Sequence, residues 1–416
     1  MASFSSATLA TAIVPMTTPS QNFPVVIIGA GPAGATASLF LSEQGIAHAI
    51  VDKAEFPRDK VDGNFFGNKV LGVLGQVRQG KVRRELLNSP HMLRCDGGLR
   101  LVSTQGSSFG MNWAGGDAGL GSDVFTMARL HFDQVLVNHL ESSHATVHLG
   151  TAITGLKRDK DGIELTVETP DGEQRWRSQY ILGADGEQSI VRRVLSSQPE
   201  RPEEDRANTL HAYYSGVIDD RDRPYSAAYL VPGQSRCFVY VVPLAGGTHK
   251  VGFIGLPGFD GTKLERLLDE TLATHSALSK RFAQAKRIGD VGIWPASHNQ
   301  PPLDNLSGDR FLLLGDAGSL LVPHVGFGTG NAILSGKLAA ETITAAIAAN
   351  RSDAEFLERY NASLRNNIQT SIKAGIWLKR MARYPRTMNW FIEQSKIRQV
   401  FKFLLGKKGD TGLKWI

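Results

Sequence analysis

The sequence of 416 residues contains little cysteine and no long apolar run. Cys95 and Cys237 are its two cysteines, which excludes a disulfide scaffold and a cysteine-rich metal or iron–sulfur site and favours a reducing compartment. No apolar run approaches the roughly 20 residues that cross a bilayer, so no transmembrane helix is expected. The eleven histidines lack paired spacings such as HExxH, and no metal site is predicted. These absences predict a cytoplasmic protein.

Charge is missing from the N-terminal segment. Residues 1–24 contain no charged residue and eight Ser or Thr. A signal peptide needs a basic segment before a continuous apolar core, and a transit peptide needs arginines. We therefore expect residues 1–23 to form a disordered leader.

Positive charge gathers at the other end of the chain. Residues 361–416 carry 12 Lys and Arg against 2 Asp and Glu, whereas the remaining 360 residues carry 34 against 38. No nucleic-acid-binding signature accompanies this tail, so no nucleic acid partner is predicted. Three interpretations of the basic, aromatic tail stay open: peripheral docking on an anionic membrane surface, contact with an acidic carrier protein, or a solvated helical cap whose aromatic residues pack on the main body.

A β-α-β unit is predicted near the N-terminus. Residues 24–28 form the run of branched apolar residues that is typical of a buried parallel strand, residues 35–44 favour a helix, and residues 47–51 predict a second strand. Between the first strand and the helix, residues 29–34 read Gly-Ala-Gly-Pro-Ala-Gly and match the dinucleotide fingerprint GxGxxG. The match is specific because strand, helix and second strand surround it in the required order.

Each glycine of this fingerprint has a physical role. Gly29 allows the tight turn, Gly31 lets the backbone approach a pyrophosphate, and Gly34 lets helix and strand pack closely. The helix then directs its free N–H groups and positive dipole end at the phosphates. Asp52 lies 23 residues after Gly29, where its carboxylate can accept hydrogen bonds from a ribose. The unit therefore predicts dinucleotide binding.

The rest of the chain predicts an α/β fold: a Rossmann-like domain, an inserted and mostly antiparallel β-sheet domain that faces the substrate, and C-terminal helices. Arg129 begins an amphipathic helix. A meander is predicted from four strand-like runs at 146–149, 152–156, 163–168 and 174–182. The predicted boundaries are 24–72, 123–200 and 294–350 for the discontinuous nucleotide-binding domain, 73–122 and 201–293 for the substrate domain, and 351–416 for a basic helical segment.

Several motifs together resemble a known superfamily. The fingerprint at 29–34, the Arg129 helix, Gly-Ala-Asp-Gly at 183–186 and Gly-Asp at 315–316 occur in the order found in FAD-dependent aromatic hydroxylases, the flavoprotein monooxygenases. The chain more closely resembles the geranylgeranyl reductase branch. That branch has a Phe-Pro-Arg-x-Lys-x-Cys-Gly element, matched at 56–63, and a Gly-Asp-Ala segment ending in Ser-Gly-x-x-Ala-Ala-Glu, similar to 315–341. The resemblance covers residues 24–345 and implies FAD as the cofactor.

The resemblance also implies roles for particular residues. Asp52 would hold the adenosine ribose, Arg129 would reach the FAD phosphate region, and Asp316 would bind the ribityl–pyrophosphate stretch. The glycines at 326–330 would begin a helix whose N-terminus stabilises the negative charge of the reduced flavin. The predicted cofactor-binding residues are Gly29, Gly31, Ala33, Gly34, Asp52, Lys53, Arg58, Arg129, Asp185, Gly315, Asp316, Pro323, Gly326, Gly328 and Thr329.

The candidates for catalysis and substrate binding include departures from the family pattern. His324 is either a general acid near the flavin or a hydrogen-bonded loop histidine. Asp62 stands where the branch has cysteine, which changes both charge and proton supply. Residues 238–243 lack the tryptophan of the branch's Tyr-x-Trp-x-Phe-Pro strand, and Tyr240 and Val242 of this strand are the predicted substrate contacts.

The favoured function is therefore reduction of a C=C bond in a sizeable hydrophobic substrate. The alternative is an FAD-dependent monooxygenase that hydroxylates a hydrophobic or carrier-tethered aromatic substrate. A halogenase ranks lower because its Trp-x-Trp-x-Ile-Pro motif is absent. No second dinucleotide fingerprint is present, so electrons arrive either from transiently docked NAD(P)H or from a separate reductase.

Overall fold

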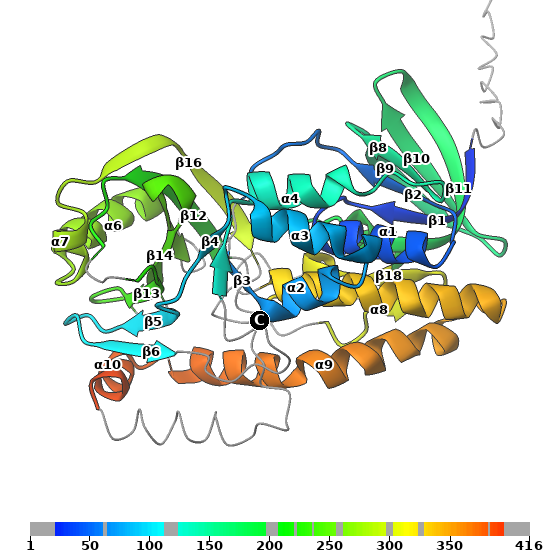
Figure 1. Cartoon of the computed structure of the whole chain (residues 1–416). Coiled ribbons are helices and arrows are strands. Elements are labelled where there is room, and N and C mark those ends of the chain that lie inside the picture. The colour runs from blue at the N-terminus through cyan, green and yellow to red at the C-terminus, as the bar shows by residue number, and fades with distance from the viewer. Residues whose placement is uncertain are drawn as a thin grey trace, which may run out of the picture.

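The computed structural model describes residues 21–60, 65–111, 124–196, 207–219, 223–234, 237–254, 261–296, 303–322, 328–381 and 383–394. These residues form an eight-stranded sheet, a seven-stranded sheet and a three-stranded sheet with helices around them (Figure 1). The α/β fold class predicted from the sequence is confirmed: a Rossmann-like parallel sheet is combined with an antiparallel sheet and C-terminal helices.

We call the eight-stranded sheet the parallel sheet. Its main path is β17-β18-β11-β1-β2-β8, and the pairs β18–β11, β11–β1, β1–β2 and β2–β8 are all parallel. The antiparallel hairpin of β9 and β10 is joined to it through β11. Its strands are β1 (Gln21–Ile28), β2 (His48–Asp52), β8 (Ala145–Leu149), β9 (Ala152–Arg158), β10 (Ile163–Thr169), β11 (Gly172–Gly183), β17 (Ser307–Gly308) and β18 (Phe311–Leu313).

Two sequence expectations about this sheet need correction. β1 begins at Gln21, three residues before the predicted start, because Gln21 to Phe23 pair with Trp176 to Ser178 of β11. β8 does not belong to the predicted meander: it pairs with β2 in parallel, whereas β9, β10 and β11 form the antiparallel part. Alternation of side chains reveals a strand, but it does not reveal which strand becomes its neighbour.

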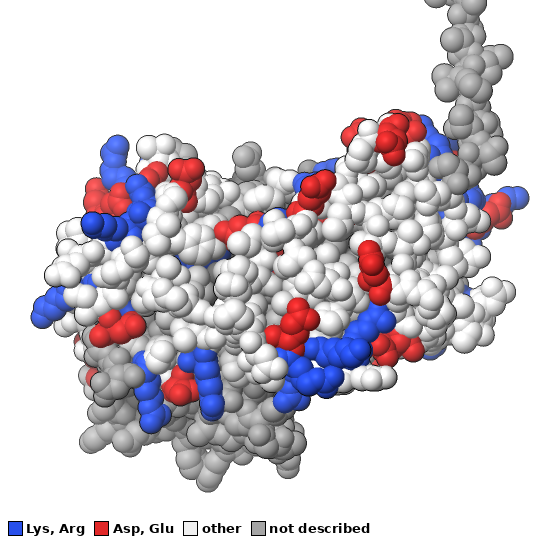
Figure 2. Space-filling model, turned by 45° about the horizontal axis from the view of Figure 1, so that its top comes forward, with Lys and Arg blue, Asp and Glu red and all other residues white. Residues whose placement is uncertain are grey.

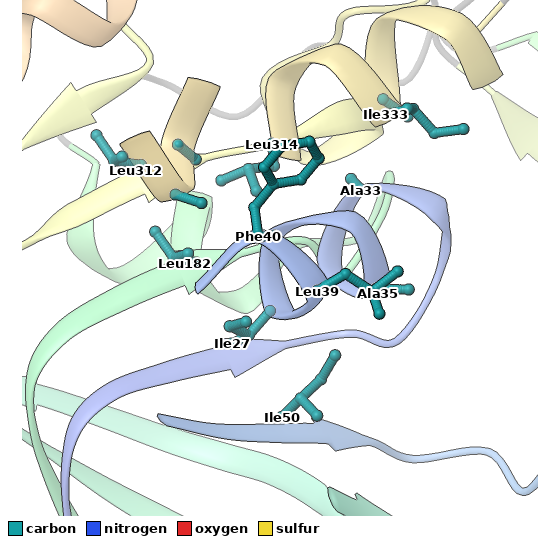
Figure 3. Packing of buried hydrophobic residues seen from close by; sticks show 14 of the residues in the cluster. Ile27, Ala33, Ala35, Leu39, Phe40, Ile50, Leu182, Leu312, Leu314 and Ile333 are labelled. Carbon is teal, nitrogen blue, oxygen red and sulfur yellow. The ribbon is translucent and has the colours of Figure 1, made fainter. Parts of the chain in front are cut away.

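The parallel sheet is buried on both faces. All five residues of β2 are buried, as are the last four residues of β1, which is why these strands are continuous apolar runs. Helix α1 (Pro32–Glu43) packs between this sheet and α8 (Thr329–Ala348), and Leu39, Phe40 and Ile333 lie in the same core (Figure 3). Gly336 permits the close contact, because a Cβ there would lie 2.3 Å from the carbonyl oxygen of Ala33.

We call the seven-stranded sheet the antiparallel sheet, since only β13 and β5 pair in parallel within it. Its strands, in spatial order, are β16 (Lys286–Ala296), β12 (Ala207–Ser215), β15 (His249–Ile254), β14 (Phe238–Pro243), β13 (Ser226–Leu230), β5 (Leu99–Val102) and β6 (Ser108–Met111). One face packs on α6 (Gly261–Thr274): Val239, Val241 and Val251 share a core with Leu264 and Leu268.

The remaining elements are a small three-stranded sheet and the helices that pack around the two large sheets. Figure 1 shows α9 running beside α8 and ending near α10, which lies next to β6. The three-stranded sheet has the order β3 (Phe65–Gly67), β7 (Val124–Thr126) and β4 (Leu93–Arg94). The other helices are α2 (Asn68–Leu74), α3 (Lys81–Asn88), α4 (Arg129–Asn138), α5 (Ile190–Leu195), α7 (Leu278–Arg281), α9 (Ala354–Met381), α10 (Pro385–Glu393) and the 3-10 turns η1 (Arg78–Gly80), η3 (Ala245–Gly247) and η4 (Gly315–Gly318).

Candidate functional site

Loops from four parallel strands meet at one edge of the parallel sheet. The N–H of Ala184, after β11, donates to the carbonyl of Ile28 at the end of β1 (2.8 Å). The N–H of Leu314, after β18, donates to the carbonyl of Gly183 (2.8 Å). Because the carboxyl ends of parallel strands share an edge, the motifs that follow β1, β2, β11 and β18 are gathered there, where ligands bind in sheets of this class.

The turn after β1 has room for glycine alone at two positions. Gly29 has a φ of +103°, and a Cβ there would lie 2.3 Å from the carbonyl oxygen of Ala184. A Cβ at Gly34 would lie 1.8 Å from the carbonyl oxygen of Gly29. At Gly31 the nearest atom to such a Cβ is Nη2 of Arg58, 3.7 Å away, which is ordinary van der Waals contact, so the protein itself does not crowd this position. The backbone of the turn is thus exposed to a ligand at Gly31.

Helix α1 begins at this turn without a side-chain cap. Gly31 is the N-cap residue and accepts the N–H of Ala35 through its carbonyl, but no side chain in the described part of the chain caps the first turn. Pro32 occupies the first helical position, and the first turn carries no acidic residue. The unsatisfied N–H groups and the helix dipole therefore favour an anion in front of α1.

Asp52, at the end of β2, holds the turn in place. Its Oδ2 accepts the N–H of Ala30 (2.8 Å) and its Oδ1 accepts the N–H of Ala54 (2.9 Å). Nη2 of Arg58 lies 3.8 Å from the same Oδ2. Each carboxylate oxygen can accept a further hydrogen bond, so the same side chain can fix the glycine turn and still accept from a ribose hydroxyl.

Arg58 also contacts a buried pair of charged residues on α4, Arg129 and Asp133. Asp133 is fully buried, and its carboxylate accepts two hydrogen bonds from Arg129, from Nε at 2.6 Å and from Nη2 at 2.7 Å. Nη1 of Arg58 lies 3.5 Å from Asp133 Oδ2. Asp133 is not among the site residues predicted from the sequence, although its spacing of four residues from Arg129 on a helix is the signal for this pair. Asp133 thus fixes the orientation of Arg129.

Asp185, after β11, leaves one oxygen without a partner. Its Oδ2 accepts the N–H groups of Ile190 (2.7 Å) and Val191 (3.4 Å) at the start of α5. Oδ1 is buried and has no hydrogen-bond partner among the described residues. Burial is the largest cause that raises the pKa of the Asp185 carboxyl above its ordinary value, against hydrogen bonds that lower it. An orphaned acceptor of this kind suits a ligand that donates a hydroxyl proton.

The loop after β18 provides a second helix N-terminus. Gly315 has a φ of +54°, and Asp316 follows it in η4. Nζ of Lys60 lies 3.3 Å from Asp316 Oδ2. A Cβ at Gly328 would lie 3.6 Å from Asp316 Oδ1, and Gly328 caps α8 without any side-chain hydrogen bond. Asp316 therefore lies beside the N-terminus of α8, whose first residue is Thr329.

The antiparallel sheet brings its second face toward the same region. Tyr240 lies directly opposite Gly252, where a Cβ would come within 1.7 Å of the Tyr240 ring. Val242 lies opposite Lys250, a fully buried lysine whose Nζ donates to the carbonyl of Lys60 (3.1 Å). Since residues directly opposite share a face, Tyr240, Val242 and Lys250 are all on the face that meets the segment ending at Lys60.

The structure thus brings most of the predicted cofactor residues to one edge and places the predicted substrate residues on the adjoining sheet. Ala33 lies in the first turn of α1, whereas Lys53 is exposed just after β2. Sequence reasoning missed Lys250 and Gly252, whose alternation with the buried Val251 and Phe253 was the available signal. The predicted residues Asp62, Pro323, His324 and Gly326 lie outside the described residues.

The residues present fit a pyrophosphate-linked dinucleotide. Two uncapped helix N-termini suit phosphate or another negatively charged group, and the glycine turn at 29–34 admits a close backbone approach. Asp52 and the orphaned Oδ1 of Asp185 can accept hydroxyl protons from sugar or ribityl groups.

Comparison with known proteins also indicates a dinucleotide cofactor, FAD. Residues 22–373 match the family described as "FAD binding domain". Digeranylgeranylglycerophospholipid reductase 2 from Methanopyrus kandleri is 25% identical over 352 residues, which cover 82% of this chain and 81% of the reductase. The 3-(3-hydroxy-phenyl)propionate/3-hydroxycinnamic acid hydroxylase from Paraburkholderia xenovorans is 27% identical over 74% of this chain and 47% of the hydroxylase.

A solved structure shares the fold. A geranylgeranyl bacteriochlorophyll reductase-like protein from Thermoplasma acidophilum superposes with a TM-score of 0.77 at 18% identity, over 95% of this chain and 98% of that protein. Among the described residues, no helix combines the length and the apolar character that crossing a bilayer requires.

Proposed function

Because the chain belongs to the FAD binding domain family and is an FAD-dependent oxidoreductase, we propose that it reduces a C=C bond in a large hydrophobic substrate of polyprenyl type. The observation that carries this proposal is the junction at Lys60. The Phe-Pro-Arg-x-Lys element, which resembles that of geranylgeranyl reductases, connects Asp316 at the predicted flavin loop to Lys250 on the antiparallel sheet. The similarity to an archaeal lipid reductase over most of both chains supports the same reaction class.

In this proposal FAD lies along the carboxyl edge of the parallel sheet. Gly31 and the N-terminus of α1 receive the pyrophosphate, and Asp52 accepts from the adenosine ribose. Arg129 approaches the phosphate region in the orientation that Asp133 imposes. Asp316 accepts from the ribityl chain, and the N-terminus of α8 faces the flavin edge that becomes negative on reduction.

The substrate lies against the second face of the antiparallel sheet. Tyr240 is half-buried there, and Val242 is buried beside it. Farther along the same face, Leu101 and Leu230 are covered by Phe391 and Ile392 of the C-terminal helix α10, so the open part of the face is the part around Tyr240 and Val242. The aromatic ring of Tyr240 and the apolar side chain of Val242 suit contact with a hydrocarbon chain better than contact with a small polar molecule.

The reduction of each double bond needs two electrons and two protons, which arrive as one hydride and one proton. When bound and reduced, FAD supplies hydride to carbon, and NAD(P)H is the proposed source of the electrons. The protein's own contribution is to orient the double bond and to deliver the proton. His324 and Asp62 are the residues that the sequence predicts for proton delivery, because imidazole titrates near neutral pH and carboxyl groups act as general acids when an enzyme holds them protonated.

The test is an anaerobic incubation of dithionite-reduced holoenzyme with a detergent-solubilised polyprenyl lipid. The expected result is product heavier by two hydrogens per reduced bond, accompanied by return of the oxidised flavin spectrum. Reoxidation without any mass gain would contradict the proposal. Wild-type enzyme left oxidised is the matched control and should yield no product.

The alternative function is monooxygenation of an aromatic substrate, which the similarity to the hydroxycinnamic acid hydroxylase favours. Rapid mixing of reduced enzyme with oxygen distinguishes the two. A substrate-dependent product heavier by one oxygen atom would support the alternative, whereas simple reoxidation with release of hydrogen peroxide and no oxygenated product would reject it.

A further inference from the structure

The C-terminal helices carry an exposed patch of aromatic and basic side chains. Trp377 is 40% exposed, Tyr384 is 64% exposed and Trp390 is 52% exposed. They are the aromatic members among the exposed large apolar residues in the part of the chain that the structure describes. We call this surface the basic–aromatic patch, and its residues are Trp377, Arg380, Arg383, Tyr384, Arg386 and Trp390, with all three arginines exposed.

The arginines of this patch differ in their ion pairing from two arginines earlier in the chain, Arg351 just before α9 and Arg365 within α9. Arg351 forms ion pairs with Asp353 and Glu355, and Arg365 lies 3.9 Å from Glu358. Within the described ranges, Arg380, Arg383 and Arg386 have no such pairing, and residues 361–394 contain a single acidic residue, Glu393. Figure 2 shows basic and acidic groups interspersed over the face it displays.

The cations and the aromatic rings are placed as neighbours by helix geometry. Trp377 and Arg380 are three residues apart near the end of α9, and Arg386 and Trp390 are four residues apart on α10, so each pair shares a helix face. The side chain of Trp377 also contacts the Phe391 ring edge-on, with ring centroids 6.3 Å apart. Amphipathic rings beside basic groups are typical of segments that lie in a membrane–water interface.

The buried side of α10 packs on one end of the sheet face that is proposed to bind the substrate. Phe391 and Ile392 are buried and pack against Leu101 and Leu230 of the antiparallel sheet. Asn389 Oδ1 accepts the N–H of Thr104 (2.9 Å), which fixes the helix next to β5. α10 therefore carries part of the basic–aromatic patch on its exposed side, and its buried side covers one end of the sheet face on which the substrate is proposed to bind.

We propose that the basic–aromatic patch docks the protein on an anionic lipid bilayer surface. The arginines contact lipid headgroups while the tryptophan and tyrosine rings enter the interface, so that a membrane-resident hydrocarbon chain can reach the apolar face beside α10. The attraction rises by about fivefold in binding constant for each basic residue near an anionic surface. The purpose of docking rests on the proposed function, but the binding itself does not.

Flotation of the FAD-loaded protein with lipid vesicles tests this inference without any turnover. We expect flotation with vesicles of phosphatidylcholine mixed with phosphatidylglycerol, much less with phosphatidylcholine alone, and release by high salt. The variant Arg380→Gln/Arg383→Gln/Arg386→Gln should bind about 100-fold more weakly, from about fivefold per residue. Trp390→Ser should weaken binding further. Brominated lipids should quench the tryptophan fluorescence of the wild-type protein, and the quenching should be smaller in this variant.

A matched control removes the same charge elsewhere. Lys81, Lys157 and Lys280 are exposed and lie on α3, β9 and α7. The variant Lys81→Gln/Lys157→Gln/Lys280→Gln should float as wild type does, and circular dichroism and FAD content should be unchanged in both triple variants. Equal flotation on the two vesicle types, equal losses in both triple variants, or binding of an acidic carrier protein with no binding of anionic vesicles would overturn the inference. Failure of C=C reduction alone would leave these results unaffected.

Discussion

The two large sheets prepare a site in different ways. The parallel sheet is buried on both faces, so it can offer a ligand only the backbone and side chains that follow its strand ends, such as the glycine turn at 29–34 and Asp52. The antiparallel sheet buries one face on α6 and presents the other, where Tyr240 and Lys250 project from the strands themselves. Ligand binding at the parallel sheet therefore depends on the space around the backbone, whereas ligand binding at the antiparallel sheet depends on the chemistry of its side chains.

The largest effect is expected from filling backbone space at the parallel sheet. In Gly34→Val the new Cβ would begin 1.8 Å from the carbonyl oxygen of Gly29, so β1 and α1 must separate. We expect a loss of about 3 kcal/mol or more in unfolding free energy, measured by urea denaturation, together with loss of FAD binding. Gly31→Ala is the matched control, because its Cβ makes only an ordinary van der Waals contact with Arg58 and should lower FAD affinity with little change in stability. A Gly34→Val protein with wild-type stability and bound FAD would refute this account of the turn.

A smaller effect is expected from removing the carboxylate that holds the same turn. Asp52→Ala leaves the N–H groups of Ala30 and Ala54 without their acceptor. We expect a loss of about 2 kcal/mol in stability and at least a tenfold weaker FAD affinity, measured by denaturation and by fluorescence titration. Asp52→Asn keeps one carbonyl oxygen as an acceptor and should lie between the two proteins. Equal affinities in all three would show that Asp52 does not contact the cofactor.

The corresponding glycine substitution in the antiparallel sheet should leave FAD binding unchanged. In Gly252→Ala the Cβ would lie 1.7 Å from the Tyr240 ring, which is the far end of a side chain and can rotate away. We expect a stability loss of about 1 kcal/mol, an unchanged FAD content and a raised KM for the hydrophobic substrate. Val241→Ala, on the opposite face and in the core with α6, serves as a control that lowers stability without changing KM. A loss of FAD from Gly252→Ala would contradict the separation of the two sheets' roles.

The smallest expected effect concerns Asp185 and depends on pH. Burial raises the pKa of its carboxyl above the ordinary 3.8, so the native state binds more protons than the unfolded state between the two values. This group's contribution to stability is therefore present at low pH and is lost as the pH rises through the folded pKa. Asp185→Asn removes the buried charge and should unfold at a higher temperature than wild type near neutral pH, with the gap closing toward pH 3.8. A gap in Tm that is independent of pH would contradict this explanation.

Local patterns allowed much of the nucleotide-binding half to be predicted. The β1-α1-β2 unit follows from its glycine spacing, because the exclusion of a side chain at Gly34 acts against Gly29, five residues earlier in the same turn. The position of Asp52 follows from the same unit. The helix starting at Arg129 was also predicted, as was the helical character of the C-terminal segment.

The pairing of distant strands could not be predicted. β8 pairs with β2 rather than with its sequence neighbour β9, and β5 joins β13 across more than a hundred residues. Lys250 was missed because its burial depends on the Lys60 carbonyl, a contact between segments that no local pattern connects. The same holds for burial in the C-terminal helices. Phe391 packs on the antiparallel sheet, whereas its neighbour Trp390 is exposed, and the sequence alone does not show which of the two aromatic side chains is buried.

Titration of the cofactor-free protein with FAD in a calorimeter, read together with the visible spectrum, tests the central claim most directly. We predict saturable binding of one FAD per chain, a yellow protein after gel filtration, and loss of both signals in Gly34→Val while Gly252→Ala retains them. A wild-type protein that stays colourless and releases no heat, or a Gly34→Val protein that binds FAD as wild type does, would contradict a cofactor site at the carboxyl edge of the parallel sheet.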